Sequence, residues 1–339
     1  MSQKLFPAEW MPQSAILLAW PHPQTDWAHM LDEVQDCFHN IVTVIAQFQK
    51  VILLVPDTTT AKSLKSYFNN NVKLVVIPTN DTWARDFGPI SIQENGKWSI
   101  LDFKFNGWGL KFAANKDNLV TRRMLEKDIF NLNITYENHL NFVLEAGSIE
   151  SDGEGTLLTT SECLLSTNRN GQLNQIQIEE YLKQTLGVKR ILWLNNGYLL
   201  GDDTDSHIDT LARFCNKETI AYIQCTDTQD VHYNALKAME TELKSFLTID
   251  GNKYKLIPLP MADEVIFNGE RLPATYANFL IINGAILVPT YNSTKDKIAL
   301  KRLQKAFPNY EIIGINCLPL IKQHGSLHCV TMQFPKGVY

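Results

Sequence analysis

The sequence lacks the features by which several large classes of protein are recognised. No apolar run in its 339 residues approaches the ~20 residues that a membrane-spanning helix needs, and the amino-terminal MSQKLFPAEWMPQ contains no hydrophobic signal-peptide core. Basic residues do not predominate, since 31 Lys and Arg stand against 36 Asp and Glu, with a formal net charge of −5. We therefore expect neither membrane insertion nor secretion, and the acidic balance argues against nucleic acid as a partner.

Metal, nucleotide and disulfide motifs are also missing. The six cysteines form no C-x-x-C pair and no dense framework. Such scatter is typical of a reducing compartment, so we expect a cytoplasmic location. The sequence contains neither H-E-x-x-H nor an EF-hand loop, and neither G-x-G-x-x-G nor a P-loop. It therefore predicts no metal and gives no support for a nucleotide cofactor.

What the chain does contain is an alternation of short apolar runs and helical patterns. The apolar runs, which predict buried strands, are 16–21, 51–56, 73–78, 190–195, 255–260 and 285–290. The helical patterns are 26–48, 174–186, 229–246 and 293–307. No linker or low-complexity tract interrupts residues 1–339, so we expect a single α/β domain. This alternation leaves a doubly wound sheet, a barrel and a propeller-like arrangement open.

Four segments place polar residues in apolar surroundings, where burial without a partner costs several kcal/mol. They are NDTWARDFGP (80–89), LEAGSIESDGEG (144–155), GDDTDSHIDTLARF (201–214) and GSLHCVTM (325–332). In the third, His207 and Asp209 would share one face of an extended chain, which suits a common site. A histidine moves protons near neutral pH, and a carboxylate beside it orients the ring or holds a cation. The alternative is a solvated acidic loop, because Asp202, Asp203 and Asp205 precede the pair.

Two further acids have both structural and functional interpretations. Arg85 stands beside Asp86 and near Asp81, so this segment could form a structural salt bridge. Glu145 follows the apolar run NFVL and precedes two small residues, Ala146 and Gly147. Its carboxylate is either capped by backbone amides or part of a site.

Cys329 follows a histidine near the end of the chain. A lone cysteine is usually a buried, inert residue, because only the thiolate is strongly nucleophilic. The alternating pattern predicts a strand with Cys329 and Thr331 on one face and His328 on the other. A base for Cys329 would then come from elsewhere in the chain, and His207 is the candidate.

Taken together, the segments resemble the agmatine deiminase family and its bacterial peptidylarginine deiminase relatives. The resemblance is carried, in order along the chain, by FPAEWMPQSAILLAWPH, NDTWARDFGP, LDFKFNGWG, LEAGSIESDGEGTLLTT, DTDSHIDTLARF, YANFLIINGAILVPTY and GSLHCVT. It implies the pentein fold, a five-bladed α/β propeller of pseudo-repeated strand-strand-helix-strand units around a central polar active site, and no metal or other cofactor.

The resemblance also implies roles for individual residues. By motif, Cys329 matches the nucleophile, His207 the general acid/base, Asp86 and Asp209 the carboxylates that hold a guanidinium, Glu145 the acid that supports the histidine, and Trp83 a wall of the substrate site. Carboxylates bind a planar guanidinium through paired, charge-assisted hydrogen bonds and fix its carbon for attack. A covalent thiouronium intermediate and its hydrolysis would follow.

The reaction implied is hydrolysis of agmatine to N-carbamoylputrescine and ammonia, on a small cationic guanidine substrate. Arginine or peptidylarginine as substrate is the alternative, and a non-catalytic guanidine-binding relative is a third. A closed acidic pocket would favour agmatine, whereas a spare Arg or Lys would favour arginine. Ala146, Ser206 and the segment His324-Gly325-Ser326 depart from the family pattern, which puts substrate preference in question. A homo-oligomer is an ordinary expectation on symmetry grounds.

Overall fold

Five sheets with a common strand order organise the protein. We analysed a computed structural model that describes residues 4–339. Within these residues, each of the five larger sheets contains an antiparallel pair whose inner strand pairs in parallel with a further strand. The connection between two parallel strands is a crossover, and these crossovers contain the helices.

The strands of the sheets run as follows. The first sheet has the order β19 (Met332–Pro335), β2 (Gln13–Ala19), β3 (Lys50–Val55) and β4 (Val72–Val76), and the second β1 (Lys4–Leu5), β5 (Ile90–Glu94), β6 (Lys97–Lys104) and β7 (Thr135–Val143). The third joins β8 (Ile149–Ser151), β9 (Thr156–Thr160) and β10 (Arg190–Leu194), the fourth β11 (Ala212–Asn216), β12 (Thr219–Gln224) and β13 (Lys255–Pro260), and the fifth β16 (Leu280–Ile282), β17 (Ala285–Thr290) and β18 (Glu311–Asn316). A small hairpin pairs β14 (Ile266–Phe267) with β15 (Glu270–Arg271).

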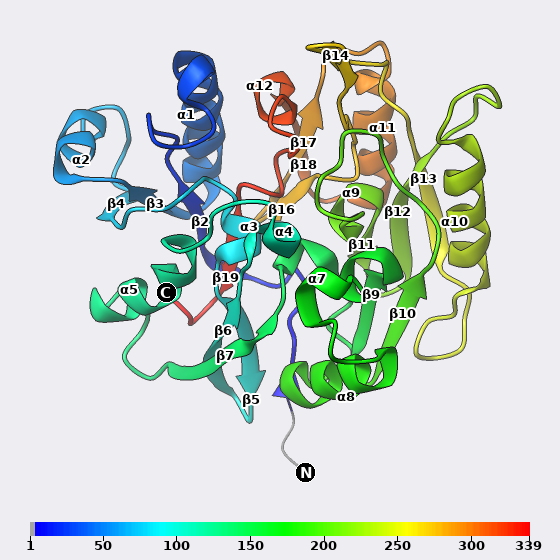
Figure 1. The fold of residues 1–339 in the computed structure, drawn as a ribbon, viewed down its shortest axis with the longest axis horizontal. Helices are drawn as coiled ribbons and strands as arrows, with labels where there is room; N and C mark the ends of the chain where they lie inside the picture. The colour runs from blue at the N-terminus through cyan, green and yellow to red at the C-terminus, as the bar shows by residue number, and fades with distance from the viewer. Residues whose placement is uncertain (1–3) are drawn as a thin grey trace.

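The long helices lie on the outside of the molecule (Figure 1). They are α1 (Leu31–Phe48), α8 (Gln175–Leu186), α10 (Tyr233–Ser245) and α11 (Asp296–Ala306). Shorter helices are α2 (Thr58–Leu64), α3 (Ala84–Phe87), α4 (Gly107–Leu110), α5 (Val120–Glu126), α6 (Ser161–Leu164), α7 (Thr167–Asn170), α9 (Ile208–Leu211) and α12 (Leu318–Ile321), with 3-10 turns at Ala28–Met30, Asp117–Leu119 and Ala146–Ser148. Each long helix presents a buried apolar stripe to its sheet, which is what fixes it there.

The sequence predicts this alternation correctly. All six apolar runs contain the greater part of a strand, and all four helical patterns contain a helix. The central strands β2, β3 and β17 are almost wholly buried, as their continuous apolar composition requires. A single doubly wound sheet is excluded for residues 4–339, because the strands divide among separate sheets that mix parallel and antiparallel pairs. The fold is mixed α/β.

Two local predictions are wrong. Cys329 lies in a turn, not a strand, and β19 begins only at Met332. The backbone N–H of Thr331 donates to the carbonyl of His328, which closes this turn. His207 and Asp209 are not on an extended chain, because His207 is the N-cap of α9 and Asp209 lies in its first turn. In both places contacts with distant segments override the local alternation.

Two strands that are far apart in the sequence, β2 and β19, are neighbours in the first sheet. Strand β19 pairs antiparallel with β2, and the red and blue ribbons run side by side in Figure 1. No helix within residues 4–339 combines the length and apolar character needed to cross a bilayer.

Candidate active site

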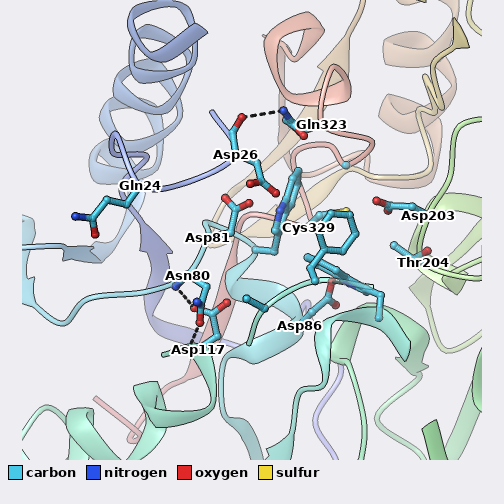
Figure 2. Close-up of a pocket in the computed structure, with 15 residues that line it drawn as sticks. Gln24, Asp26, Asn80, Asp81, Asp86, Asp117, Asp203, Thr204, Gln323 and Cys329 are labelled. Atoms are coloured by element: carbon cyan, nitrogen blue, oxygen red, sulfur yellow. Dashed lines mark hydrogen bonds between the residues drawn. The ribbon is translucent and has the colours of Figure 1, made fainter. Parts of the chain in front are cut away.

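A pocket of about 180 Å³ leads from the surface to the sulfur of Cys329 (Figure 2). Asp86, Trp83 and Trp108 line its inner part. Five aspartates contribute to its walls, namely Asp26, Asp81, Asp86, Asp117 and Asp203. None of the described residues that line it is a lysine or an arginine. The pocket is therefore rich in carboxyl groups that an arriving cation could ionise.

The Cys329 thiol is buried and held by a neighbouring amide. Asn278 Nδ2 donates to the Cys329 sulfur over 3.3 Å, and the backbone N–H of Arg85 donates to the Cys329 carbonyl over 3.1 Å. The sulfur lies 3.9 Å from Asp209 Oδ2. Burial, followed by the charges of Asp209 and Asp86, raises the pKa of the Cys329 thiol well above its ordinary value. Without a ligand the thiol is therefore protonated, and an arriving cation would favour its ionisation.

Asp209 projects from α9 with one carboxylate oxygen occupied and the other free. Oδ2 accepts a hydrogen bond from His328 Nδ1 over 2.7 Å, whereas the buried Oδ1 has no hydrogen-bond partner among the described residues. Burial alone would raise the pKa of this carboxyl, but the hydrogen bond and charge of His328 lower it below the ordinary value. Asp209 therefore presents an ionised, unpaired oxygen, for which a cationic donor is the natural partner.

Asp86, in α3, is held by neutral donors only. Trp108 Nε1 donates to Oδ2 over 2.9 Å, and the backbone N–H of Gly147 donates to Oδ1 over 3.1 Å. Burial, together with the carboxylates of Asp209 and Glu145, raises the pKa of Asp86 well above its ordinary value. The two carboxyl groups whose charges act on the Cys329 thiol therefore differ: Asp209 is ionised, and Asp86 stays protonated until a cation binds.

Gly147 is the point at which three of these side chains converge. A Cβ atom at this position would lie 2.7 Å from His207 Nδ1, 2.8 Å from Asp86 Oδ1 and 3.3 Å from Asp209 Oδ2. These separations are too short for any side chain, so only glycine permits the three groups to approach one backbone position. The sequence signal of small residues after Glu145 is explained by this packing.

His207 is completely buried, and neither of its ring nitrogens has a hydrogen-bond partner among the described residues. Its Nδ1 lies 3.7 Å from Asp86 Oδ1. Burial lowers the pKa of His207 to about 4, against the partly compensating charges of Glu145 and Asp209. The imidazole is therefore neutral at neutral pH and able to accept a proton.

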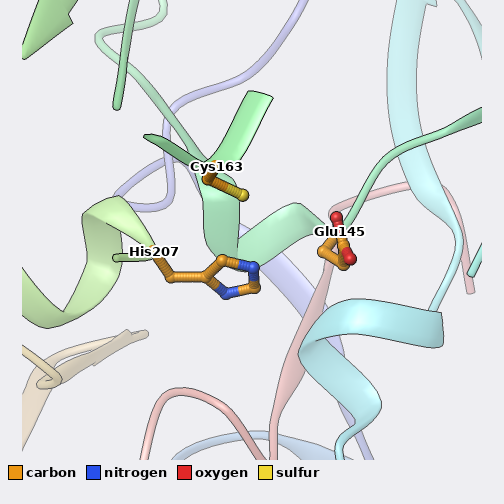
Figure 3. A group of neighbouring side chains, drawn as sticks. All are labelled: Glu145, Cys163 and His207. Atoms are coloured by element: carbon orange, nitrogen blue, oxygen red, sulfur yellow. The ribbon is translucent and has the colours of Figure 1, made fainter. Parts of the chain in front are cut away.

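Figure 3 shows the His207 ring with Cys163 and Glu145 nearby. Polar atoms of these three residues lie within 4.8 Å of one another, a spacing that a metal ion could use. The cluster does not suit a metal, because Arg169 Nε donates to both Glu145 oxygens, over 3.0 and 2.9 Å, and so places a cation there already. Burial also raises the pKa of the Cys163 thiol well above its ordinary value, which leaves it protonated.

Glu145 is therefore neither capped by backbone amides nor directed into the pocket; Arg169 binds it. Arg169 also donates to Asp205 Oδ2 over 2.5 Å and to the Thr204 carbonyl over 2.9 Å. Through Arg169, Glu145 anchors the loop that carries His207. Arg85 likewise makes no ion pair with the aspartates next to it, since its guanidinium lies 3.7 Å from Glu9.

Trp83 forms an aromatic wall of the pocket. Its ring lies 5.6 Å from that of Trp27 and 6.3 Å from that of Trp108, centroid to centroid. The ring is packed so closely against Gly325 that a Cβ atom there would overlap it. Gly325 is therefore required by the position of Trp83, which explains why the small residue of the GSLHC segment stands where it does.

Two acids in the outer part of the pocket, Asp81 and Asp117, have raised pKa values. Burial and the nearby Asp26 raise the pKa of Asp81 to about 7, and burial raises that of Asp117 to about 8. Asp203 faces them from the opposite side (Figure 2). Of the acidic run noted in the sequence, only Asp203 and not Asp202 lines the pocket.

The remaining members of that run stabilise the loop. Asp202 accepts from the Thr204 hydroxyl over 2.6 Å and from the Ser206 backbone N–H over 2.7 Å. Lys111 Nζ donates to Asp205 Oδ1 over 2.7 Å, which ties this loop to the segment that carries Trp108. Trp108 adopts a φ of 53° and Ser206 one of 61°, conformations that favour glycine, so both loops hold strained residues beside the pocket.

Sequence reasoning missed several residues that support the site. They are Glu9, Trp108, Arg169, Asn278 and His328. Four of them stand inside the segments that carry the resemblance, FPAEW, NGWG, YANF and GSLHC, so their position gave a signal. His328 was set aside because a strand was expected, and Arg169 lies in no motif.

The fold and the pocket together place the chain among mixed α/β enzymes of the guanidine-modifying class. The family described as Porphyromonas-type peptidyl-arginine deiminase matches residues 5–335. The chain belongs to this family, which includes proteins named as agmatine deiminases.

Three relatives illustrate the similarity. A Porphyromonas gingivalis structure titled "Putative Arginine Deiminase" is 53% identical, with a TM-score of 0.95 and 99% of each chain covered. A cysteine-to-serine variant of C. jejuni agmatine deiminase with substrate bound is 42% identical, with a TM-score of 0.94, covering 100% of this chain and 98% of that one. A Vibrio parahaemolyticus protein named "Putative agmatine deiminase" is 35% identical over 97% of this chain and 96% of its own length.

Proposed function

We propose that the protein hydrolyses agmatine to N-carbamoylputrescine and ammonia through a covalent intermediate on Cys329. The observation that carries this proposal is the pocket itself: five aspartates line it, it reaches Cys329, and the ionised Asp209 carboxylate lies with Oδ2 3.9 Å from the Cys329 sulfur. The family membership and the substrate-bound C. jejuni relative support it.

We further propose that residues 1–339 form one catalytic domain and that the five sheets are the blades of a pentein propeller. Four of the sheets follow the strand-strand-helix-strand order of such a blade along the chain, and the first sheet completes the same order by adding β19 to β2, α1 and β3. The proposed catalytic residues come from the second, third and fourth of these units and from the turn before β19, as a central site would require.

Substrate binding would complete the ionisation of the site, in which Asp209 is already charged. Asp209 Oδ1 is free to accept from the guanidinium, and Asp86, which tends to be protonated, would ionise against the same cation. The resulting carboxylate pair would hold the guanidinium plane and direct its carbon toward Cys329. Trp83 and Trp108 would flank the group and exclude water.

In the first chemical step the Cys329 sulfur forms a bond to the guanidino carbon and a C–N bond breaks. The thiol proton passes to the departing nitrogen by way of neutral His207, which acts as base and then as acid. Ammonia leaves, and a positively charged S-alkylthiouronium remains, so the positive charge of the substrate is conserved.

In the second step water replaces the sulfur. His207 accepts a proton from the attacking water and returns one to the leaving Cys329 sulfur, and the C–S bond breaks. The ureido group of the product is neutral, and the remaining proton is taken up by the released ammonia, which becomes ammonium. Glu145 and Arg169 would not take part in proton transfer; they would fix the loop that holds His207.

The choice of agmatine over arginine follows from charge. Arginine carries a carboxylate at its far end, and the described lining of the pocket offers that group no lysine or arginine. Agmatine ends in an ammonium, which Asp26, Asp81 and Asp117 would attract. A small cationic guanidine is thus the proposed ligand, with no role for nucleic acid, membrane or added cofactor.

The test is ammonia release from agmatine, free arginine and an arginyl peptide, measured in parallel for the wild type and for Cys329→Ala. We expect turnover of agmatine by the wild type only. Preference for arginine or the peptide would replace the substrate assignment while leaving the mechanism in place. Tight binding of agmatine without any turnover would identify the chain as a guanidine-binding relative. Equal turnover by Cys329→Ala would rule out the covalent mechanism.

A further inference from the structure

His328, immediately before the proposed nucleophile, lies between two buried carboxylates. Its Nδ1 is 2.7 Å from Asp209 Oδ2 and its Nε2 is 2.6 Å from Glu9 Oε2. The exposed fraction of its side chain is 2%. Both ring nitrogens face oxygen acceptors, so the ring donates in both directions when the two carboxylates are ionised.

Glu9 is itself held firmly from the far side. Its Oε2 also accepts from Arg213 Nη2 over 2.7 Å, and its Oε1 accepts from the backbone N–H of Ile281 over 2.7 Å. The Glu9 pKa is lowered: burial would raise it, but the charges of Arg213 and His328 outweigh burial. The carboxylate is therefore a fixed anion, against which the imidazole is oriented.

The backbone of His328 is fixed as well. Its N–H donates to Asn278 Oδ1 over 2.8 Å, and the same Asn278 side chain donates to the Cys329 sulfur. The ring that binds Asp209 and the sulfur proposed to attack are therefore positioned by one turn. A shift of His328 would move Asp209 and Cys329 together.

We infer that Glu9 and His328 act as a positioning pair for Asp209, with Glu9 orienting the ring and the ring fixing the Asp209 carboxylate beside the Cys329 sulfur, where it would receive the guanidinium. This inference rests on the proposed function, because it assigns a task to Asp209 in substrate binding. His328 is a positioning residue and does not touch the substrate.

The contrast with Asp86 supports this inference. Asp86 receives only the neutral N–H groups of Trp108 and Gly147 and both of its oxygens are occupied. Asp209 has a ring donor on one oxygen and, within residues 4–339, no donor on the other. An unpaired carboxylate oxygen this deeply buried is costly unless a ligand completes it, so the arrangement on Asp209 has the form of a prepared ligand contact.

Replacing His328 by asparagine or by glutamine tests the two hydrogen bonds of its ring one at a time. The side-chain nitrogen of asparagine occupies nearly the place of histidine Nδ1, and that of glutamine nearly the place of Nε2. His328→Asn therefore keeps the donor to Asp209 and loses the one to Glu9, whereas His328→Gln does the reverse. Each variant loses one buried hydrogen bond, so the two are matched for stability.

We expect His328→Asn to retain kcat/KM for agmatine within a few-fold and His328→Gln to lose about tenfold to a hundredfold, the usual effect of one hydrogen bond to a charged group. Their melting temperatures should be similar. Equal losses in both variants, in step with melting temperature, would show a merely structural role and overturn the inference, as would a fully active His328→Gln.

Glu9→Gln provides a second route if either histidine variant does not fold. It should lower kcat/KM, whereas the control Glu150→Gln should not, because Glu150 accepts from Arg213 and makes no hydrogen bond to His328. Equal effects of the two glutamate substitutions would count against the positioning pair.

Crystal structures of His328→Asn and His328→Gln make the test independent of turnover. The Asp209 carboxylate should keep its orientation in the first and rotate in the second. If the wild type turns over no guanidine, the proposed function fails, yet these structures still decide whether His328 positions Asp209. An unchanged Asp209 in His328→Gln would reject the positioning pair even in an active enzyme.

Discussion

His207 Nδ1 lies 3.7 Å from Asp86 Oδ1, and the ring has no other polar partner among the described residues. Burial keeps the imidazole neutral and favours the protonated form of Asp86. In the absence of ligand, this contact therefore joins two uncharged groups at the bottom of an acidic pocket. Asp209 is already ionised, but the charges proposed for Asp86 and Cys329 would appear only when a cation arrives, which would make the site selective before any chemistry occurs.

The first prediction concerns stability against pH. The pKa of His207 is lowered from 6.5 to about 4, so between these values the unfolded chain binds a proton that the native chain does not. Above about pH 6.5 the buried His207 therefore does not reduce the free energy of unfolding. As the pH falls toward 4, it lowers this free energy. The cost is about 3 kcal/mol in the free energy of unfolding.

The measurement is chemical denaturation of the wild type and of His207→Gln between pH 4 and 7. The stability difference, wild type minus variant, should fall by about 3 kcal/mol toward the acid end. The exposed His29, substituted in the same way, is the control and should leave the pH dependence unchanged. A difference that stays constant with pH would show that His207 is not buried as a neutral ring.

The second prediction separates the two carboxylates. Asp209→Asn should lower both kcat/KM and melting temperature, because His328 loses an ionised acceptor. Asp86→Asn should also lower kcat/KM, by an amount equivalent to several kcal/mol of transition-state stabilisation. Its melting temperature should stay unchanged or rise, because the substitution removes a buried carboxyl group whose pKa is raised. A loss below about threefold in kcat/KM for either variant would place that carboxylate outside the site.

The third prediction tests the convergence at Gly147. Gly147→Ala introduces a Cβ atom into the space shared by His207 and Asp86 and should lower kcat by about a hundredfold or more, since small displacements of reacting groups have large effects. Ala146→Gly is the matched control at the adjacent position, where the added flexibility should cost stability but little activity. Full activity of Gly147→Ala, measured as steady-state ammonia release, would contradict the packing described.

The fourth prediction tests recognition of the substrate tail. Asp81→Asn should raise KM for agmatine about tenfold, because a charge-assisted contact with the terminal ammonium is lost. Butylguanidine has the same length without the amine, so its kinetic constants should not change. An equal effect on both substrates would show that Asp81 shapes the pocket and does not bind the ammonium.

Elements whose signal is local were predictable from the sequence. Strands β2, β3 and β17 are buried over nearly their whole length, and their unbroken apolar runs reveal this directly. The same holds for α1 and α10, whose apolar stripes recur at helical spacing. Each of these signals depends only on neighbours a few residues away.

The turn at Cys329 could not be predicted from its neighbours in the sequence. Its shape depends on Arg85, which donates to the Cys329 carbonyl, and on Asn278, which accepts from the His328 backbone. Both partners are distant in the sequence, so local alternation suggested a strand and placed His328 on the wrong face. The contact between Glu9 and His328 spans 319 positions of the chain and was invisible for the same reason.

The pairing of β19 with β2 affects the order in which the parts of the site form during synthesis. Asp86, Glu145 and Asp209 are all translated before Cys329, and Cys329 stands in the turn that leads into β19. Strand β19 is fixed only when it docks against β2, which is made near the beginning. A nascent chain would therefore make its acidic residues first and acquire a correctly placed sulfur after them, so that reactivity would begin only once β19 has docked against β2.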